Sequence, residues 1–282
     1  DWSSDVCSSD LKNVTLVTIE TMFHELGTKA LEETLKHFDP KEVVVFSDRE
    51  LLPGSRTVHT DPIPTFRQYN EIMLKGMLEH INTDHMIFVQ WDAMAYDGSK
   101  WTDEFLEYDY IGAVWPWQPE GLNVGNGGFS LRSRKLLESL QDERIQLTES
   151  RNYIAEDAVF GIDHRALLEK EHAIKFAPSA LASRFSHEIE EGAYKYTPGF
   201  AFHGQWNIIR LASREIIDYY LPRMSYKGWN IYKWHHFLYA IVDRQLFDVM
   251  PFVMDQLTQN SPELINSLLQ WLRTEQPFWN QI

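Results

Sequence analysis

Acidic side chains stand at the ends of two apolar segments that have the composition of buried strands. Asp92 follows HMIFVQW, residues 85–91, and Asp48 follows EVVVFS, residues 42–47. A carboxylate in such a position either holds a hard cation such as Mg²⁺ or Mn²⁺ or ends the strand by bonding to the backbone of a turn. Taken alone, Asp92 fits the turn better, so a metal site requires further ligands.

Three further motifs offer groups for such a site. His203 lies in AFHGQW, where a neutral imidazole is a candidate second metal ligand and a core or loop histidine is the alternative. Glu156 and Asp157 begin a helical pattern, where acids interact favourably with the helix dipole, and in a pocket this pair offers a general base for a hydroxyl. GNGGFS, residues 125–130, needs its glycines either for a hairpin turn or for close approach to a ligand.

The surrounding segments predict an alternation of strands and helices. Strands are expected at residues 13–20, 42–48 and 85–90, and helices at about 26–38 and 66–81. This order is typical of an α/β sheet covered on both faces, which binds ligands beyond the carboxyl ends of its strands. The residues at those ends are Ser47, Asp48, Gln90, Trp91 and Asp92.

Two later parts of the chain have a different character. Residues 109–130 combine aromatic residues with glycine and proline, which indicates short strands and loops around a pocket. Trp115 and Trp117 lie there in VWPW, and with Trp91 they are candidates to stack on a ligand, with core packing as the alternative. Residues 208–282 have a helical pattern rich in Trp, Tyr and Leu. We therefore predict a domain at 12–207 and a helical C-terminal extension at 208–282.

The first eleven residues, DWSSDVCSSDL, are expected to be an artefactual tail. They have no periodicity and read as the in-frame translation of a common sequencing adapter, with a natural disordered tail as the alternative. Cys7, the only cysteine, lies in this tail, so neither a disulfide nor thiol chemistry is expected.

Composition disfavours several classes of protein. The 26 Lys and Arg against 41 Asp and Glu give a formal charge of −15, and nucleic-acid binding requires clustered cations, so no nucleic-acid partner is expected. No apolar segment approaches the roughly 20 residues that cross a bilayer, and no signal peptide is evident. A cytoplasmic location is expected, with peripheral contact to a membrane left open.

Common catalytic motifs are absent from the sequence. It has no GxxxxGKS/T phosphate loop and no GxGxxG after the first strand, which disfavours P-loop ATPases and ordinary NAD enzymes. It also has no HExxH zinc motif and no GxSxG nucleophile elbow. The acids, the glycines and the histidine described above are the groups that remain.

The order of these motifs resembles a known group of proteins. A strand ending in QWD is followed by YDYIGAVWPW, VGNGGFSLRSRKLLE, AEDAVFG, FAPSALASRFSHE and GFAFHG. This series, over residues 13–207, resembles uncharacterised bacterial and eukaryotic domains related to GT-A-fold glycosyltransferases, and more distantly the fringe and galactosyltransferase groups. The resemblance implies a GT-A-like (Rossmann-like) mixed sheet flanked by helices, and hexosyl transfer from a nucleotide-sugar donor to a hydroxyl of a saccharide or glycan acceptor.

The resemblance also implies a role for each motif. Asp92 matches the last Asp of an Asp-x-Asp metal motif and His203 a late histidine, so the two would hold Mn²⁺ or Mg²⁺. Asp157, or its neighbour Glu156, matches the base that deprotonates the acceptor hydroxyl, with inversion of the anomeric carbon. The donor nucleotide would contact Ser47, Asp48, Gln90 and Trp91. The sugar or acceptor would contact Trp115, Trp117, Asn126, Gly127 and Gly128.

One position departs from the pattern, because Gln90 stands where the first Asp of Asp-x-Asp is expected. A neutral amide oxygen holds a cation less strongly, so a metal-independent mechanism stays open. Two other functions also stay open: an inactive module that binds a nucleotide sugar or carbohydrate, and a helical interaction protein on an α/β scaffold. Candidate cations for the diphosphate, with solvated surface charges as the alternative, are Arg67, Lys75, Arg132, Arg134 and Lys135.

Overall fold

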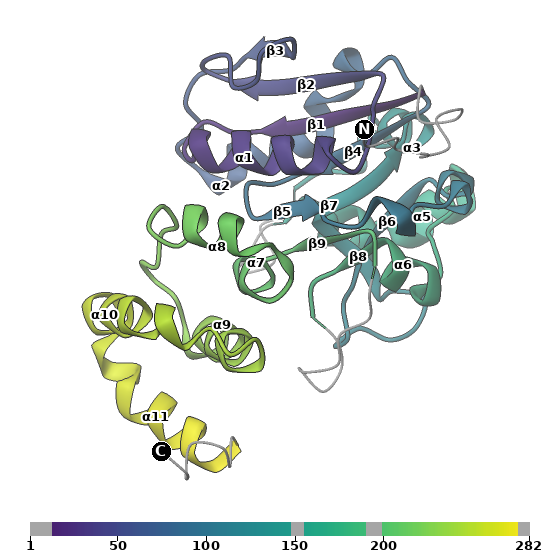
Figure 1. Ribbon diagram of the computed structural model, residues 1–282. Coiled ribbons are helices and arrows are strands. Elements are labelled where there is room, and N and C mark those ends of the chain that lie inside the picture. Colours follow the sequence, from purple (N-terminus) through teal and green to yellow (C-terminus); the bar gives the residue numbers. More distant parts are fainter. Residues whose placement is uncertain (1–12, 148–154, 190–198, 276–282) are drawn as a thin grey trace. The chain divides into compact units, whose positions relative to one another are not determined.

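The computed structural model describes residues 13–147, 155–189 and 199–275 (Figure 1). The chain divides into two compact units, one ending at Gly204 and the other beginning at Gln205. The expected tail at 1–11 lies outside the described residues, and the predicted domains at 12–207 and 208–282 stay a prediction. No helix in the described part of the chain is both long and apolar enough to span a bilayer.

A mixed sheet forms the centre of the first unit. Within the described residues its strand order is β3 (Arg56–His59), β2 (Glu42–Ser47), β1 (Val14–Ile19), β4 (His85–Val89), β7 (Val124–Ser133) and β6 (Tyr110–Val114). The neighbours β3, β2, β1 and β4 are parallel, whereas β7 is antiparallel to both β4 and β6. The fold class predicted from the sequence, a mixed sheet flanked by helices and followed by a helical part, is confirmed.

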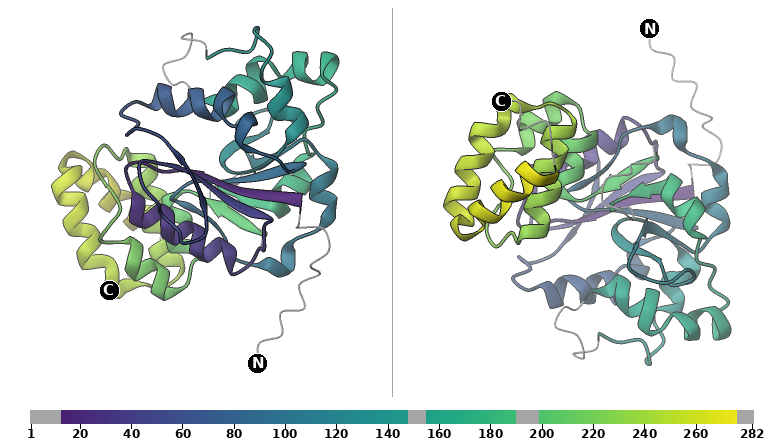
Figure 2. Two further views of the ribbon diagram at one scale, coloured as in Figure 1. Left: turned by 90° about the horizontal axis from the view of Figure 1, so that it is seen from above. Right: turned by 90° about the horizontal axis from the view of Figure 1, so that it is seen from below.

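The strands β1, β2 and β4 are largely apolar because helices cover both faces of the sheet. Adjacent residues of a strand point to opposite faces, so Leu16 belongs to the same core cluster as Leu31 of α1 (His24–Leu35), while Val17 belongs to a second cluster with Met73 and Leu137. Met73 follows α2 (Phe66–Glu71), and Leu137 belongs to α3 (Arg134–Ser139). Figure 2 shows the sheet edge-on, with α1 in purple on one side and α2 in blue on the other.

Three local features differ from the sequence-based expectation. The helix predicted at 66–81 is α-helical only to Glu71 and continues as a π-helical turn, Ile72–Gly76, and a 3₁₀ turn, Leu78–His80. The partly exposed β3 was not predicted, because it is a four-residue edge strand with little apolar pattern. GNGGFS lies inside the ten-residue β7, so the hairpin alternative is wrong.

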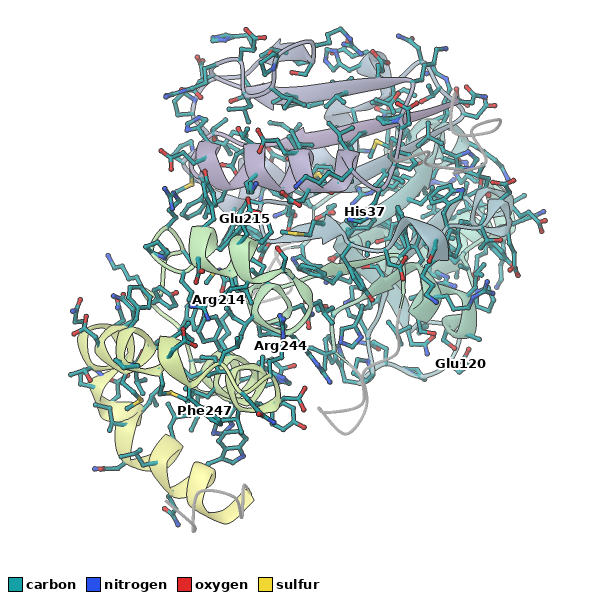
Figure 3. All side chains as sticks on the ribbon, in the orientation of Figure 1. His37, Glu120, Arg214, Glu215, Arg244 and Phe247 are labelled. Atoms are coloured by element: carbon teal, nitrogen blue, oxygen red, sulfur yellow. The ribbon has the colours of Figure 1, made fainter. Side chains whose placement is uncertain are left out.

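The second unit consists of helices around an aromatic core. Its α-helices within the described residues are α7 (Gln205–Leu211), α8 (Arg214–Tyr220), α9 (Ile231–Asp243), α10 (Met250–Asn260) and α11 (Ile265–Glu275). Trp234 is fully buried, and its indole N–H donates to Ser261 Oγ at 3.1 Å. Arg244, labelled in Figure 3, follows α9 and donates to the carbonyls of Ile209 and Ala212. These bonds satisfy carbonyls at the end of α7.

Candidate functional site

A strand pairing brings Asp92 and His203 together. After β4 the chain turns through residues 90–92 into β5 (Ala93–Ala95), which pairs antiparallel with β9 (Ala201–His203). Ala93 lies opposite His203 in this register, and the N–H of Gly204 donates to the carbonyl of Asp92 at 2.9 Å. Asp92 Oδ1 is consequently 3.5 Å from His203 Nε2.

The imidazole of His203 lies between two carboxylates. Its Nδ1 is 3.2 Å from Glu188 Oε1, whereas its other nitrogen, Nε2, faces Asp92. Burial alone would lower the pKa of His203, but the charges of Asp92 and Glu188 outweigh burial and raise the pKa to about 10. His203 is therefore an imidazolium at neutral pH, and a metal ion would have to displace its Nε2 proton.

Asp92 and His203 fit a divalent cation that brings other ligands with it. Two atoms that ligate one Mg²⁺ at about 2.1 Å lie about 3 Å apart when they are adjacent in the octahedron. The observed 3.5 Å separation requires only a small approach to reach that distance. Within the described residues no group of three or more His, Cys, Asp or Glu is arranged to hold a metal. Mg²⁺ commonly takes one or two protein ligands and completes its shell with phosphate and water.

Glycines of β7 allow three side chains to approach the strand closely. A Cβ at Gly128 would lie 2.3 Å from the ring of His203, one at Gly125 would lie 2.1 Å from the ring of Trp115, and one at Gly127 would lie 2.6 Å from the carboxylate of Glu156. Atoms in van der Waals contact keep about 3.5 Å between carbons. Close approach is therefore the reason for these glycines, and the groups that approach are side chains of the chain itself.

The two adjacent acids have different environments. The carboxylate of Glu156 is buried and accepts a bond of 2.8 Å from Arg132 Nη2. Asp157 is partly exposed, and its carboxylate accepts the backbone N–H of Gly127 at 2.9 Å. Desolvation and the charge of Glu156 raise the pKa of Asp157 to about 7, against the lowering effect of its backbone bonds and Arg132. A carboxylate with this proton affinity suits general base catalysis near neutral pH.

A cleft of about 340 Å³ joins these groups, a size within the usual range for small-ligand sites. The predicted site residues that line it are Gln90, Trp115, Trp117, Asn126, Gly127, Gly128, Glu156, Asp157 and His203. The cleft residues without a predicted role include Phe66, Tyr69, Gln118, Ile162 and Glu188. Trp115 is buried, whereas Trp117 and Phe66 expose 60% and 47% of their surface, so these two rings are open to a ligand.

The structure does not bring every predicted residue to this cleft. Ser47, Asp48, Trp91 and Asp92 are absent from its lining. Asp92 is nevertheless next to a lining residue, because its Oδ1 is 3.5 Å from Nε2 of His203. The carboxylate of Asp48 binds Arg49 and His24, which hold the pKa of Asp48 well below its usual range. The ring of Trp91 packs on Phe23 with centroids 4.9 Å apart.

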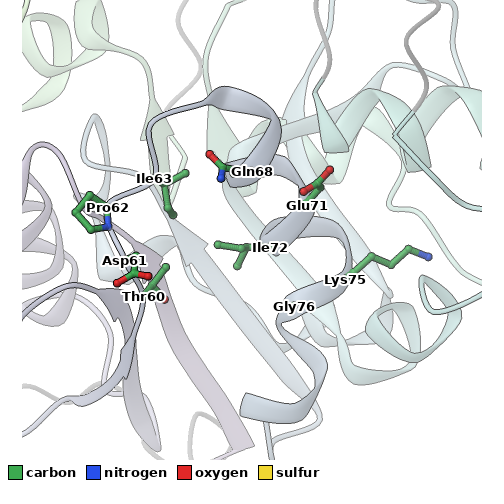
Figure 4. A pocket seen from close by; sticks show the side chains of 9 residues that line it. All are labelled: Thr60, Asp61, Pro62, Ile63, Gln68, Glu71, Ile72, Lys75 and Gly76. Atoms are coloured by element: carbon green, nitrogen blue, oxygen red, sulfur yellow. The ribbon is translucent and has the colours of Figure 1, made fainter.

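The five candidate cations also lie outside the lining of the cleft. For Arg132 the alternative of a solvated surface charge is wrong, because its side chain is fully buried. Lys75 donates to the carbonyls of Leu140 and Asp142. It lies at a second hollow of about 450 Å³ between residues 60–63 and the helical segment 68–76 (Figure 4).

Sequence reasoning missed Glu188, Tyr69 and Glu20. Glu188 ends SRFSHE, which was recognised as a motif but carried no assigned role. Tyr69 accepts a bond of 2.8 Å from the side-chain amide of Gln90. Glu20 follows β1 directly, the same signal that marked Asp48, and its carboxylate accepts the backbone N–H groups of Met22 and Phe23.

Comparisons with known proteins give one family match and distant structural similarities. The family model described as "Protein of unknown function (DUF5672)" matches residues 55–203, more than half of the 282-residue chain. No curated protein matches the chain in sequence.

Three solved structures illustrate the structural similarity. An active-site mutant of LgtC is 11% identical, with a TM-score of 0.46 over 73% of this chain and 94% of that chain. Apo mouse xyloside xylosyltransferase 1 is 12% identical, with a TM-score of 0.46 over 69% and 98% of the two chains. Mannosyltransferase PcManGT from Pyrobaculum calidifontis, in complex with GDP-Man and Mn²⁺, is 13% identical, with a TM-score of 0.41 over 59% and 54%.

Proposed function

The chain belongs to the family described as "Protein of unknown function (DUF5672)", a description that names no activity, and we propose that it is a glycosyltransferase. It transfers a sugar from a nucleotide-sugar donor to a hydroxyl of a saccharide acceptor, with inversion and with Mn²⁺ or Mg²⁺. The cleft carries this proposal, because Asp157 and His203 both line it. Asp157 is a carboxylate that binds a proton near neutral pH, and the ring of His203 faces Asp92.

Asp157 is the proposed base. The acceptor oxygen attacks the anomeric carbon of the donor, its proton passes to the carboxylate of Asp157, and the bond between that carbon and the diphosphate oxygen breaks on the opposite face. The N–H of Gly127 fixes one oxygen of the Asp157 carboxylate at 2.9 Å, which orients the group before the acceptor binds. Trp117 and Asn126, which also line the cleft, are the proposed acceptor and sugar contacts.

The donor would bind beside Asp92, His203 and Gln90. Asp92 and His203 would hold the cation, which would neutralise charge on the diphosphate as it leaves. Gln90 is held by Tyr69 and contributes a neutral group in place of a carboxylate. Ser47, Asp48 and Trp91 remain proposed contacts of the nucleotide.

A thermal-shift panel of UDP-, GDP-, CMP- and dTDP-sugars, each with and without Mn²⁺, tests the proposal. A donor at 100 times its Kd would stabilise the fold by about 2.7 kcal/mol, so one nucleotide class should raise the melting temperature in Mn²⁺. Asp157→Asn should keep this shift but lose release of nucleoside diphosphate in the presence of acceptor, because it still binds the donor. The proposal fails if no donor shifts the melting temperature under either condition.

The ion pairs of His203 favour a second candidate, an inactive module that binds a nucleotide sugar. An imidazolium that two carboxylates hold resists metal binding, and Gln90 removes one more negative charge from the expected metal site. This module would bind a donor equally well with and without a chelator and would never release nucleoside diphosphate. The same panel, followed by an assay for free diphosphate, separates the two functions.

A further inference from the structure

Arg132 is a buried charge without a role in the mechanism described above. Its side chain has no exposed surface, and its Nη2 donates to Glu156 Oε1 at 2.8 Å and its Nε to Ser130 Oγ at 3.1 Å. The guanidinium carbon lies 5.3 to 5.9 Å from the ring centres of Phe88, Tyr110 and Phe160. A buried guanidinium in such surroundings requires an anionic partner, and the carboxyl group of Glu156 is that partner.

The backbone of Gly127 holds this ion pair against Asp157. A Cβ at Gly127 would lie 2.6 Å from Glu156 Oε1, 3.1 Å from Arg132 Nη2 and 3.3 Å from Asp157 Cβ. The N–H of the same glycine donates to Asp157. One positive and two negative groups thus meet at a single strand position. Because Glu156 is paired with Arg132, Asp157 is the carboxylate of the two that is left to bind a proton.

We propose that Arg132 is a positioning residue that acts through Glu156 to leave Asp157 as the proton-accepting carboxylate of the cleft. Arg132 does not line the cleft, so it acts without contact with either substrate. The inference rests on the proposed role of Asp157 as the base and adds the two buried charges that prepare it.

The groups that face Asp157 determine the sign of each effect. Among the described residues they are Glu156 on α4 (Glu156–Ala158), Arg132 on β7 and Tyr110 on β6. Glu188 and His203 line the same cleft. Burial raises the pKa of Tyr110 well above 10, so Tyr110 stays neutral. The charge of Glu156 raises the pKa of Asp157 and that of Arg132 lowers it, with Glu156 the stronger of the two.

The test follows the titration of the Asp157 carboxyl carbon by NMR, with Asp157→Asn used to assign the signal. Glu156→Gln should move the midpoint to lower pH by about one unit or more, and Arg132→Met should move it to higher pH by a smaller amount, because the charge of Glu156 has the stronger effect. Arg132→Lys keeps the charge and should stay closer to wild type. Arg165→Met is the matched control, because Arg165 is also buried, packs on Phe176 and pairs with Glu169, and it should leave the midpoint unchanged.

The double variant Arg132→Met/Glu156→Gln covers the case in which a single variant does not fold. It removes both buried charges together, which proteins tolerate better than the loss of one, and its midpoint should fall below that of wild type but less far than in Glu156→Gln. Equal midpoints in wild type and both singles would overturn the inference, as would shifts of the same sign. A double-variant midpoint at or above the wild-type value would do so as well.

This titration needs neither donor nor acceptor, so it stands apart from the test of the proposed function. A protein that shows the two opposite shifts but turns over no nucleotide sugar would refute the glycosyltransferase proposal alone. A protein that turns over a donor but shows no shift would refute the role of Arg132 alone. In an active protein the acid limb of the pH-rate profile should move with the same signs.

Discussion

Replacing Gly128 by alanine should displace the ring of His203. The added carbon would lie 2.3 to 2.5 Å from three atoms of that ring, whereas carbon atoms in contact keep about 3.5 Å. Because β7 pairs with β4 here and the carbonyl of Gly128 accepts the N–H of Gln90 at 2.9 Å, the ring rather than the strand has to move, by about 1 Å. Overpacking of this kind costs about 1 to 3 kcal/mol, and a displacement of that size costs a catalytic site about 10²-fold in rate.

Thermal unfolding and donor turnover measure the two consequences. For a chain of this size 1 kcal/mol corresponds to about 2 to 4 °C, so Gly128→Ala should lower the melting temperature by several degrees. Gly161→Ala is the matched control, because its nearest neighbouring atom is 3.8 Å away, and it should melt within about 1 °C of wild type. In Gly128→Ala/His203→Ala the ring is absent, so the double variant should recover stability relative to additivity without recovering turnover.

Two results would refute this reasoning. If Gly128→Ala and Gly161→Ala melt at the same temperature, the ring of His203 does not pack on the β7 backbone. If the double variant is as unstable as the sum of the two single variants, the cost at Gly128 arises elsewhere.

Three further predictions concern the base, the cation and the aromatic rings. The rate should fall tenfold per pH unit below about pH 7, because protonation of Asp157, whose pKa is raised to about 7, removes the base. The measurement is a kcat/KM profile in Mn²⁺ from pH 5 to 9, and a flat profile would contradict this prediction. Asp92→Asn should abolish any Mn²⁺-dependent rise in melting temperature with donor, whereas an unchanged rise would exclude Asp92 as a ligand. Trp117→Ala should raise the acceptor KM and melt within about 1 °C of wild type, since Trp117 is 60% exposed. Because Trp115 is buried, Trp115→Ala should lower the free energy of unfolding by about 3 to 5 kcal/mol. Similar melting temperatures for the two variants would count against the roles given to these residues.

Local patterns were sufficient to predict the central strands. The segments around Val14–Ile19, Glu42–Ser47 and His85–Val89 are short and apolar because their strands are buried on both faces. β3 has no such pattern, since an edge strand buries little surface. The hairpin alternative for GNGGFS failed for a related reason: a glycine needed for close approach looks the same in sequence as a glycine needed for a turn.

Amino-acid order alone indicated the candidate groups and their places along the chain: Asp92 after a strand, the Glu156–Asp157 pair at a helix start, and His203 beside a glycine. Their partners depend on strand register, which joins segments far apart in sequence and leaves no local signal. The pairing of β5 with β9 sets Asp92 against His203, and the fold turns Arg132 from an apparent surface charge into the buried partner of Glu156. The proton affinity of Asp157 follows from those placements, because burial and neighbouring charge exist only in the folded chain.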